Sequence, residues 1–186
     1  MSSSTVTPLP DLRRIVTAHN ETGVSIIQSD SSFPMETTPI PGVKVAGSWI
    51  TTETPSKDNN LTASEDGTSR QLEGHKLTQP NGTTLRYTDL APGAATPMHR
   101  TPSIDFNILV QGEIILILKD GSETHLKVPG ETVVQKGTLH AWKNPGTTWA
   151  RLAAVLVDAE PAVVNGESLG LKWELPEGFK VPPKAE

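Results

Sequence analysis

Glycine and proline divide this chain into short pieces, and that division constrains its fold more than any other feature. The 186 residues contain 15 Gly and 16 Pro, spread along the whole length. No segment keeps a 3.6-residue apolar period over a dozen residues, as an amphipathic helix would. Short runs rich in β-branched residues alternate instead with turn residues, which is typical of β-sandwiches and barrels. We therefore predict an all-β fold.

The predicted strands form an early pair and a dense later group. Residues 13–19 and 24–28 flank the stretch NETG and predict a hairpin that turns at Gly23. A further run follows at 43–50. The later group comprises 84–90, 99–110, 113–119, 123–128, 132–135 and 150–157, with an edge strand expected at 169–173. This number of strands suits a small jelly-roll barrel, whose interior can hold one small ligand.

Composition divides the single expected domain into four parts. Residues 1–11 predict a flexible N-terminal tail, and residues 12–82 predict N-terminal strands and a polar loop that pack on the barrel. The barrel core is expected at 83–158, and the proline-containing residues 159–186 predict a C-terminal wrapping tail. Residues 51–70 have almost no apolar anchors, so they predict either a mobile excursion or a lid.

Charge and cysteine content exclude several classes of function. The formal net charge is -5, whereas nucleic acids and anionic membranes select clustered Lys and Arg. Because the chain has no Cys, it forms no disulfide, thiolate metal site or cysteine nucleophile. It shows neither a secretory signal nor an apolar run of the roughly 18 residues that a membrane span needs. We therefore expect a cytoplasmic protein with no nucleic-acid or membrane partner and no nucleotide cofactor.

One predicted strand carries polar side chains where a core strand should be apolar. Alternate residues from 99 to 107 are polar, while those of the opposite parity from 104 to 110 are apolar. Side chains alternate across a strand, so the polar set shares one face. That set is His99, Thr101, Ser103, Asp105 and Asn107. If other segments cover the apolar face, the polar face lines the interior of the barrel.

A second histidine follows a glycine turn further along the chain. His140 lies in QKGTLHAWKN, and Trp142 shares its face if that stretch is extended. Two imidazoles and a carboxylate are a recognised ligand set for non-haem Fe(II), and His/Asp sets also bind Zn or Mn. We therefore predict His99, Asp105 and His140 as catalytic residues and as ligands of a divalent metal. Without a metal, the same residues form an acid–base set.

Five further residues are predicted to contact a small-molecule substrate. Asn107 or Gln135 would hold a substrate carbonyl group. Arg86, on the preceding strand, would meet a carboxylate through its forked guanidinium. Thr101 and Trp142 are expected to line the pocket.

The spacing of these residues resembles the first sequence motif of the cupin superfamily. That motif, G-x5-H-x-H-x3,4-E-x6-G, is matched in spacing by Gly93, His99, Thr101, Asp105 and Gly112. Thr101 stands where the family has a second histidine, and Asp105 replaces the glutamate with a shorter side chain. A neutral Thr hydroxyl is a poor ligand for Zn or Fe. The resemblance therefore implies at most three good protein ligands, which leaves positions open for substrate or water.

The second motif, G-x5-P-x-G-x2-H-x3-N, is also similar to a stretch of this chain. It begins at Gly130 and continues through Gly137, His140 and Asn144, with one residue fewer before the proline position. Gln135 stands where proline is usual. The two motifs cover about 93–144, and the strand pattern extends the resemblance over about 83–158.

Local variants of these motifs resemble one branch, the small single-domain cupins of fungi and bacteria. Fungal members are commonly described as cupin-domain oxidoreductases of specialised-metabolite pathways. The resemblance implies a single cupin barrel and a homodimer in which the N-terminal hairpin is exchanged. It also implies a polyketide-type small-molecule enzyme with metal-assisted chemistry, favoured as an oxidoreductase. Two alternatives stay open: a Zn-dependent or metal-free lyase or isomerase (dehydratase, decarboxylase or cyclase), and a non-catalytic binder of a small ligand.

Overall fold

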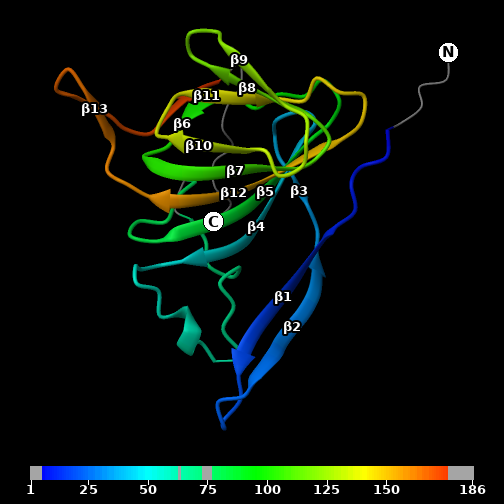
Figure 1. Cartoon of the computed structure of the whole chain (residues 1–186), viewed down its shortest axis with the longest axis vertical. Coiled ribbons are helices and arrows are strands. Elements are labelled where there is room, and N and C mark those ends of the chain that lie inside the picture. Colours follow the sequence, from blue (N-terminus) through cyan, green and yellow to red (C-terminus); the bar gives the residue numbers. More distant parts are fainter. Residues whose placement is uncertain (1–5, 63, 73–76, 176–186) are drawn as a thin grey trace.

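The computed structural model describes residues 6–62, 64–72 and 77–175, and the regular secondary structure there is almost all β-strand (Figure 1). The described part has no α-helix and only one 3-10 turn, η1 (Asp58–Asn60). The all-β prediction is therefore confirmed. Parts of both expected tails, 1–5 and 176–186, lie outside the described residues. None of the helical structure described is long and apolar enough to cross a membrane.

Two antiparallel sheets form the body of the molecule. The six-stranded sheet has the order β10 (Thr132–Lys136), β7 (Ser103–Gln111), β12 (Ala150–Asp158), β5 (Thr83–Leu90), β4 (Val43–Thr51) and β3 (Glu36–Thr37). The five-stranded sheet has the order β15 (Lys172–Glu174), β6 (Met98–Arg100), β11 (His140–Lys143), β8 (Ile114–Leu118) and β9 (Glu123–Leu126). The jelly-roll prediction is confirmed, but the closed barrel is wrong. The two sheets stay separate in the described part of the chain, and they form a sandwich.

The predicted single strand at 99–110 is wrong, because the chain changes sheets in its middle. β6 ends at Arg100 in one sheet, and β7 begins at Ser103 in the other. Between them, the amide of Ser103 donates to the carbonyl of Thr101 at 2.9 Å, which closes a tight turn over Pro102. Proline has no N–H for a sheet ladder, so a strand tends to end there. The crossing sends His99 and Asp105 to facing sheets.

The inward face of β7 divides the interior into a polar half and an apolar half. Ser103, Asp105 and Asn107 point inward and are buried, as the alternation predicts. Two residues further on, the same face carries Leu109, which is fully buried in the apolar core. Leu90, Ile114, Trp142 and Leu152 belong to the same core cluster. The opposite face of β7 is less covered than expected, since Phe106 is 40% and Val110 is 41% exposed.

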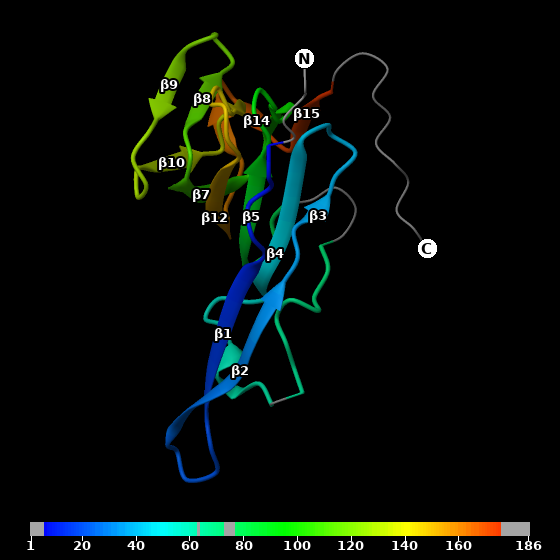
Figure 2. The same ribbon diagram turned by 90° about the vertical axis from the view of Figure 1, so that its right-hand side faces the viewer.

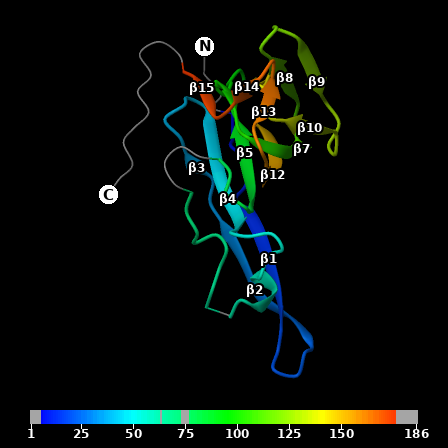
Figure 3. The ribbon, with the colours of Figure 1, turned by 90° about the vertical axis from the view of Figure 1, so that its left-hand side faces the viewer.

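The early hairpin is confirmed and projects from the sandwich as a two-stranded arm (Figures 2 and 3). β1 (Leu12–His19) pairs with β2 (Ser25–Phe33), and Gly23 in the turn has a φ of 78°. Four short strands were not predicted from the sequence: β3, β11 and the hairpin of β13 (Ala162–Val164) with β14 (Glu167–Leu169). The predicted edge strand at 169–173 forms as β15, displaced toward its C-terminal end.

The polar segment 51–70 packs beside this arm. Arg14, on β1, donates to Asp66 and Thr68 of the segment and to the carbonyl of Ser48. Asp58 accepts hydrogen bonds from Arg70 and from the Trp49 indole, the latter at 2.7 Å. Among its described residues, none lines the interior cavity. In this structure the segment therefore lies against the arm and away from the cavity.

Candidate functional site

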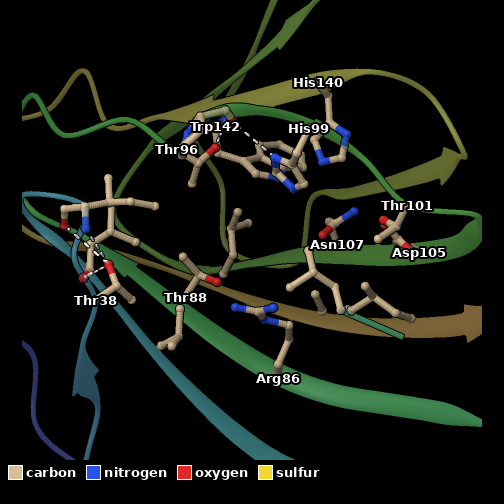
Figure 4. Close-up of a pocket in the computed structure, with 18 of the residues that line it drawn as sticks. Thr38, Arg86, Thr88, Thr96, His99, Thr101, Asp105, Asn107, His140 and Trp142 are labelled. Atoms are coloured by element: carbon tan, nitrogen blue, oxygen red, sulfur yellow. Dashed lines mark hydrogen bonds between the residues drawn. The ribbon is translucent and has the colours of Figure 1, made fainter. Parts of the chain in front are cut away.

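A cavity of about 210 Å³ lies between the two sheets, in the polar half of the interior (Figure 4). Its polar lining comes from both sheets and includes Arg86, His99, Thr101, Asp105, Asn107 and His140. An apolar end is formed by Ile40, Val43, Trp142 and Leu152. A small concave site of this kind, apolar with a few convergent polar groups, is typical of small-molecule binding.

Two histidines form one wall of the cavity. His99 on β6 and His140 on β11 are register partners in neighbouring strands, so their rings meet with centroids 4.3 Å apart. The Nδ1 atoms of both lie 2.9 Å from a backbone carbonyl, of Pro97 for His99 and of Thr138 for His140. A carbonyl oxygen only accepts, so each Nδ1 carries the ring proton. Each Nε2 therefore keeps a free lone pair.

Burial keeps both imidazoles in the neutral form. Burial, helped by the neighbouring His140 and the positive charge of Arg86, lowers the pKa of His99 to about 3, against the opposing effect of the hydrogen bond to Pro97. Burial also lowers the pKa of His140. At neutral pH the wall is a pair of uncharged bases.

Two tryptophans hold the histidine rings in place. Trp142 on β11 meets the ring of His140 edge-on, with centroids 5.6 Å apart. Trp173 on β15 is the register partner of His99 and stacks on its ring at 4.9 Å, with an interplanar angle of 14°. Trp173 was not predicted as a site residue. Its one sequence signal was the alternating run at 169–173, which indicated an edge strand but not the strand that it joins.

The opposite wall carries the charged groups of the cavity (Figure 4). Asn107 on β7 and Arg86 on β5 face Ala154 of β12 from its two sides, so they share one rung of the sheet. Asp105 lies on the next rung, beside Leu156. Burial raises the pKa of the Asp105 carboxyl to about 6, while Arg86 opposes that rise. Burial lowers the pKa of Arg86, and Asp105 opposes that change.

The chain has clear relatives among fungal proteins. It is 32% identical over 169 residues to the Oryzines biosynthesis cluster protein J of Aspergillus oryzae, covering 87% of this chain and 90% of that protein. It is 33% identical over 170 residues to the cupin-domain-containing oxidoreductase virC of Hypocrea virens, covering 85% and 83%. The chain belongs to the cupin superfamily. A similar 33% identity over 171 residues links this cupin to the Phomopsin biosynthesis cluster protein C' of Diaporthe leptostromiformis, with 87% of each chain covered.

Two other comparisons add little about activity. No family model matches the cupin. The solved cupin-2 domain of Rru_A2000 from Rhodospirillum rubrum covers 92% of the chain at 14% identity, with a TM-score of 0.44. Similarity at that level says nothing about a reaction.

The cavity of this cupin brings together most of the predicted site residues. His99, Asp105 and His140 all line it, as do the predicted substrate contacts Arg86, Thr101, Asn107 and Trp142. Gln135 does not line it: its side-chain amide donates to the hydroxyl of Thr138, in the turn before His140. The catalytic and binding roles of these residues stay predictions.

The predicted three-residue metal site is not assembled. Across the residues that the structure describes, no three His, Asp or Glu side chains are grouped so that they could hold a metal ion. The crossing at Pro102 places Asp105 on the sheet that faces the two imidazoles. Only the Nε2 atoms of His99 and His140 are available as a pair of nitrogen ligands, which is fewer than the three of a catalytic zinc site. The residues present do not fit a three-ligand centre.

The state of the two histidines predicts a definite NMR signature. We expect the side-chain ¹⁵N spectrum to show both rings as the neutral Nδ1–H form at neutral pH, and the His99 ring to stay neutral down to about pH 5, because burial disfavours the imidazolium. Since the pKa of His99 is below its unfolded value of 6.5, the unfolded chain binds the proton more tightly. The free energy of unfolding should therefore fall as the pH drops below about 6.5. The ring signals are assigned by comparing wild type with His99→Asn and His140→Asn, each of which lacks the signals of one ring. An Nε2–H form, or protonation of His99 near pH 6.5, contradicts this account.

Proposed function

We propose that this cupin is a small-molecule enzyme of specialised metabolism that transfers a proton on a carbonyl compound. The observation that carries the proposal is the pair of neutral imidazoles, whose Nε2 lone pairs are free beside a largely apolar cavity. A neutral histidine with a free nitrogen is the most common general base in enzymes. The names of the relatives, which refer to biosynthesis clusters, support the assignment to specialised metabolism.

The chemistry follows from the two walls of the cavity. Nε2 of His99 or His140 removes a proton from the carbon next to a substrate carbonyl, and the electron pair moves to the carbonyl oxygen. The positive charge of Arg86, on the wall that faces the histidines, stabilises the enolate. Asp105, with a pKa of about 6, can donate a proton from the facing wall. If the enolate takes up a proton at a different atom, the substrate is isomerised. If the enolate instead expels a hydroxide, which takes up a proton and leaves as water, the substrate is dehydrated.

The histidine pair can be tested without knowing the natural substrate. A panel of polyketide-type carbonyl compounds would be incubated with the cupin in D₂O and examined by mass spectrometry for incorporated deuterium. We expect His99→Ala and His140→Ala to lower the exchange rate of an active compound by about 10² to 10⁴, the usual contribution of a general base. His125→Ala, an exposed histidine on β9, is the matched control and should exchange normally. Folded His99→Ala and His140→Ala variants with full activity would reject the proposal.

A metal-assisted oxidoreductase is the second candidate, because several relatives carry that name. His99 and His140 would be the residues that hold the ion, and the metal would supply Lewis-acid or redox chemistry. Elemental analysis of untagged protein separates the two candidates. We expect Fe, Mn and Zn well below one per chain, because two imidazoles retain a divalent ion weakly. One redox metal per chain, lost in His140→Ala, would favour the oxidoreductase.

We also propose that the cupin is a homodimer in which the β1–β2 arm packs against a second copy. The arm exposes several apolar side chains, among them Ile15 and Ile27, the latter 63% exposed. The 51–70 segment contacts the arm through Arg14, but Ile15 and Ile27 stay exposed, and exposed apolar side chains gathered in this way mark an interaction surface. Light scattering should give about twice the 19.9 kDa chain mass. Ile27→Asp should lower the measured mass toward that of one chain, whereas the control Val163→Asp on β13 should leave it unchanged. A wild-type mass of one chain rules the dimer out.

A further inference from the structure

We infer that the substrate of this cupin is an organic acid bound as its anion, with its carboxylate held by Arg86. This inference rests on the proposed function of the cavity, and it specifies the class of molecule that the cavity takes. The structure supports it through three features: a guanidinium without a partner, an adjacent amide donor without a partner, and an apolar chamber beyond them.

Arg86 points into the cavity without a counterion of its own. The structure gives its guanidinium no hydrogen bond and no ion pair with any residue that it describes, whereas Arg151 on the other face of the same sheet pairs with Asp89 at 2.6 Å. Asp105 attracts the guanidinium from the next rung but does not reach it. Arg86 is half-buried, so its guanidinium is open to the cavity, and a ligand anion there would give it a charge-assisted hydrogen bond that no described residue provides.

The neighbours of Arg86 leave room for the anion. Ala154 separates Arg86 from Asn107 on the same rung, and its small side chain leaves space above the sheet for a ligand. The Asn107 side chain is only 5% exposed, and its Nδ2 atom has no hydrogen-bond partner. In native proteins a buried donor without a partner calls for an explanation. Guanidinium and amide donors flanking one alanine match the two oxygens of a carboxylate.

The charge of the site favours a monoanion over a phosphate. Of the described residues that line the cavity, Arg86 is the only Arg or Lys, and Asp105 adds a carboxyl to the same wall. A doubly charged phosphate would therefore meet one cation and an opposing acid. Away from Asp105 the chamber is lined by Ile40, Val43 and Trp142 together with the uncharged side chains of Thr38, Thr88 and Thr96, which suits an uncharged, largely apolar or aromatic remainder. A carboxylic acid with such a remainder would place its carboxylate at Arg86 and its apolar part in the chamber.

The test compares two probes of nearly equal shape, benzoate and the neutral benzamide. Binding is followed by NMR through the indole N–H signals of Trp142 and Trp173, which both line the cavity. We expect wild type to bind benzoate at least about tenfold more tightly than benzamide, as a charge-assisted hydrogen bond in a buried site would give. Arg86→Gln should abolish that preference, Arg86→Lys should retain part of it, and Arg13→Gln on the exposed arm should leave it unchanged.

Three results would overturn the inference: equal affinity for the two probes, a preference that survives Arg86→Gln, or benzoate that fails to shift the two indole signals. Folding of each variant is checked first by its amide spectrum, and Arg86→Lys keeps the test valid if Arg86→Gln unfolds. His140→Gln separates this inference from the proposed reaction. Charge-selective binding that persists in His140→Gln supports the anion site whether or not the histidine pair proves catalytic.

Discussion

The chain crosses from one sheet to the other at Pro102, and the chemistry of the cavity depends on that crossing. A tight turn closed by the Ser103 amide ends one short strand and starts the next. Without it, the polar residues from 99 to 107 would all lie on a single wall. With it, His99 joins His140 in one sheet, while Asp105 and Asn107 face them from the other. The turn at Pro102 thus separates the two imidazoles from Asp105 and Asn107.

The two walls differ in charge because burial acts on them differently. Imidazoles out of water lose their protons readily, so the histidine wall is neutral. A guanidinium keeps its charge under almost any condition, so half-buried Arg86 keeps a positive charge on the facing wall, next to the Asp105 carboxyl. Such an arrangement suits a substrate that brings negative charge to one wall and an acidic C–H to the other. Trp173 of β15 supports the histidine wall by stacking on the His99 ring.

Residue alternation and spacing were enough to predict much of this site. The polar parity of residues 99 to 107 predicted an inward polar face, and all five of those side chains are buried. His140, which follows a glycine turn, was predicted to join His99, and the two rings are in contact. The crossing was missed, although Thr101-Pro102 in the middle of a predicted strand is a recognised reason for a strand to end. Because of the crossing, His99 and Asp105 face each other from two sheets and do not follow one another along a single strand.

Other features depended on long-range pairing that a single sequence does not reveal. The neighbour of β6 is β15, some seventy residues later in the chain, so the stacking of Trp173 on His99 could not be predicted from local pattern. Gln135 was expected in the pocket through its motif position, but its amide is used by Thr138. Arg86 was expected to meet a carboxylate, and its direction into the cavity became clear only from its rung beside Ala154.

A crystal structure of the purified cupin, with anomalous data collected near the Fe and Zn absorption edges, would test the separation of the two walls most directly. The account predicts that His99 and His140 bond through Nδ1 to the carbonyls of Pro97 and Thr138. It also predicts that Asp105 stays on the facing wall, with no anomalous peak shared by the three side chains. A metal peak bound at once by His99, Asp105 and His140 would contradict it.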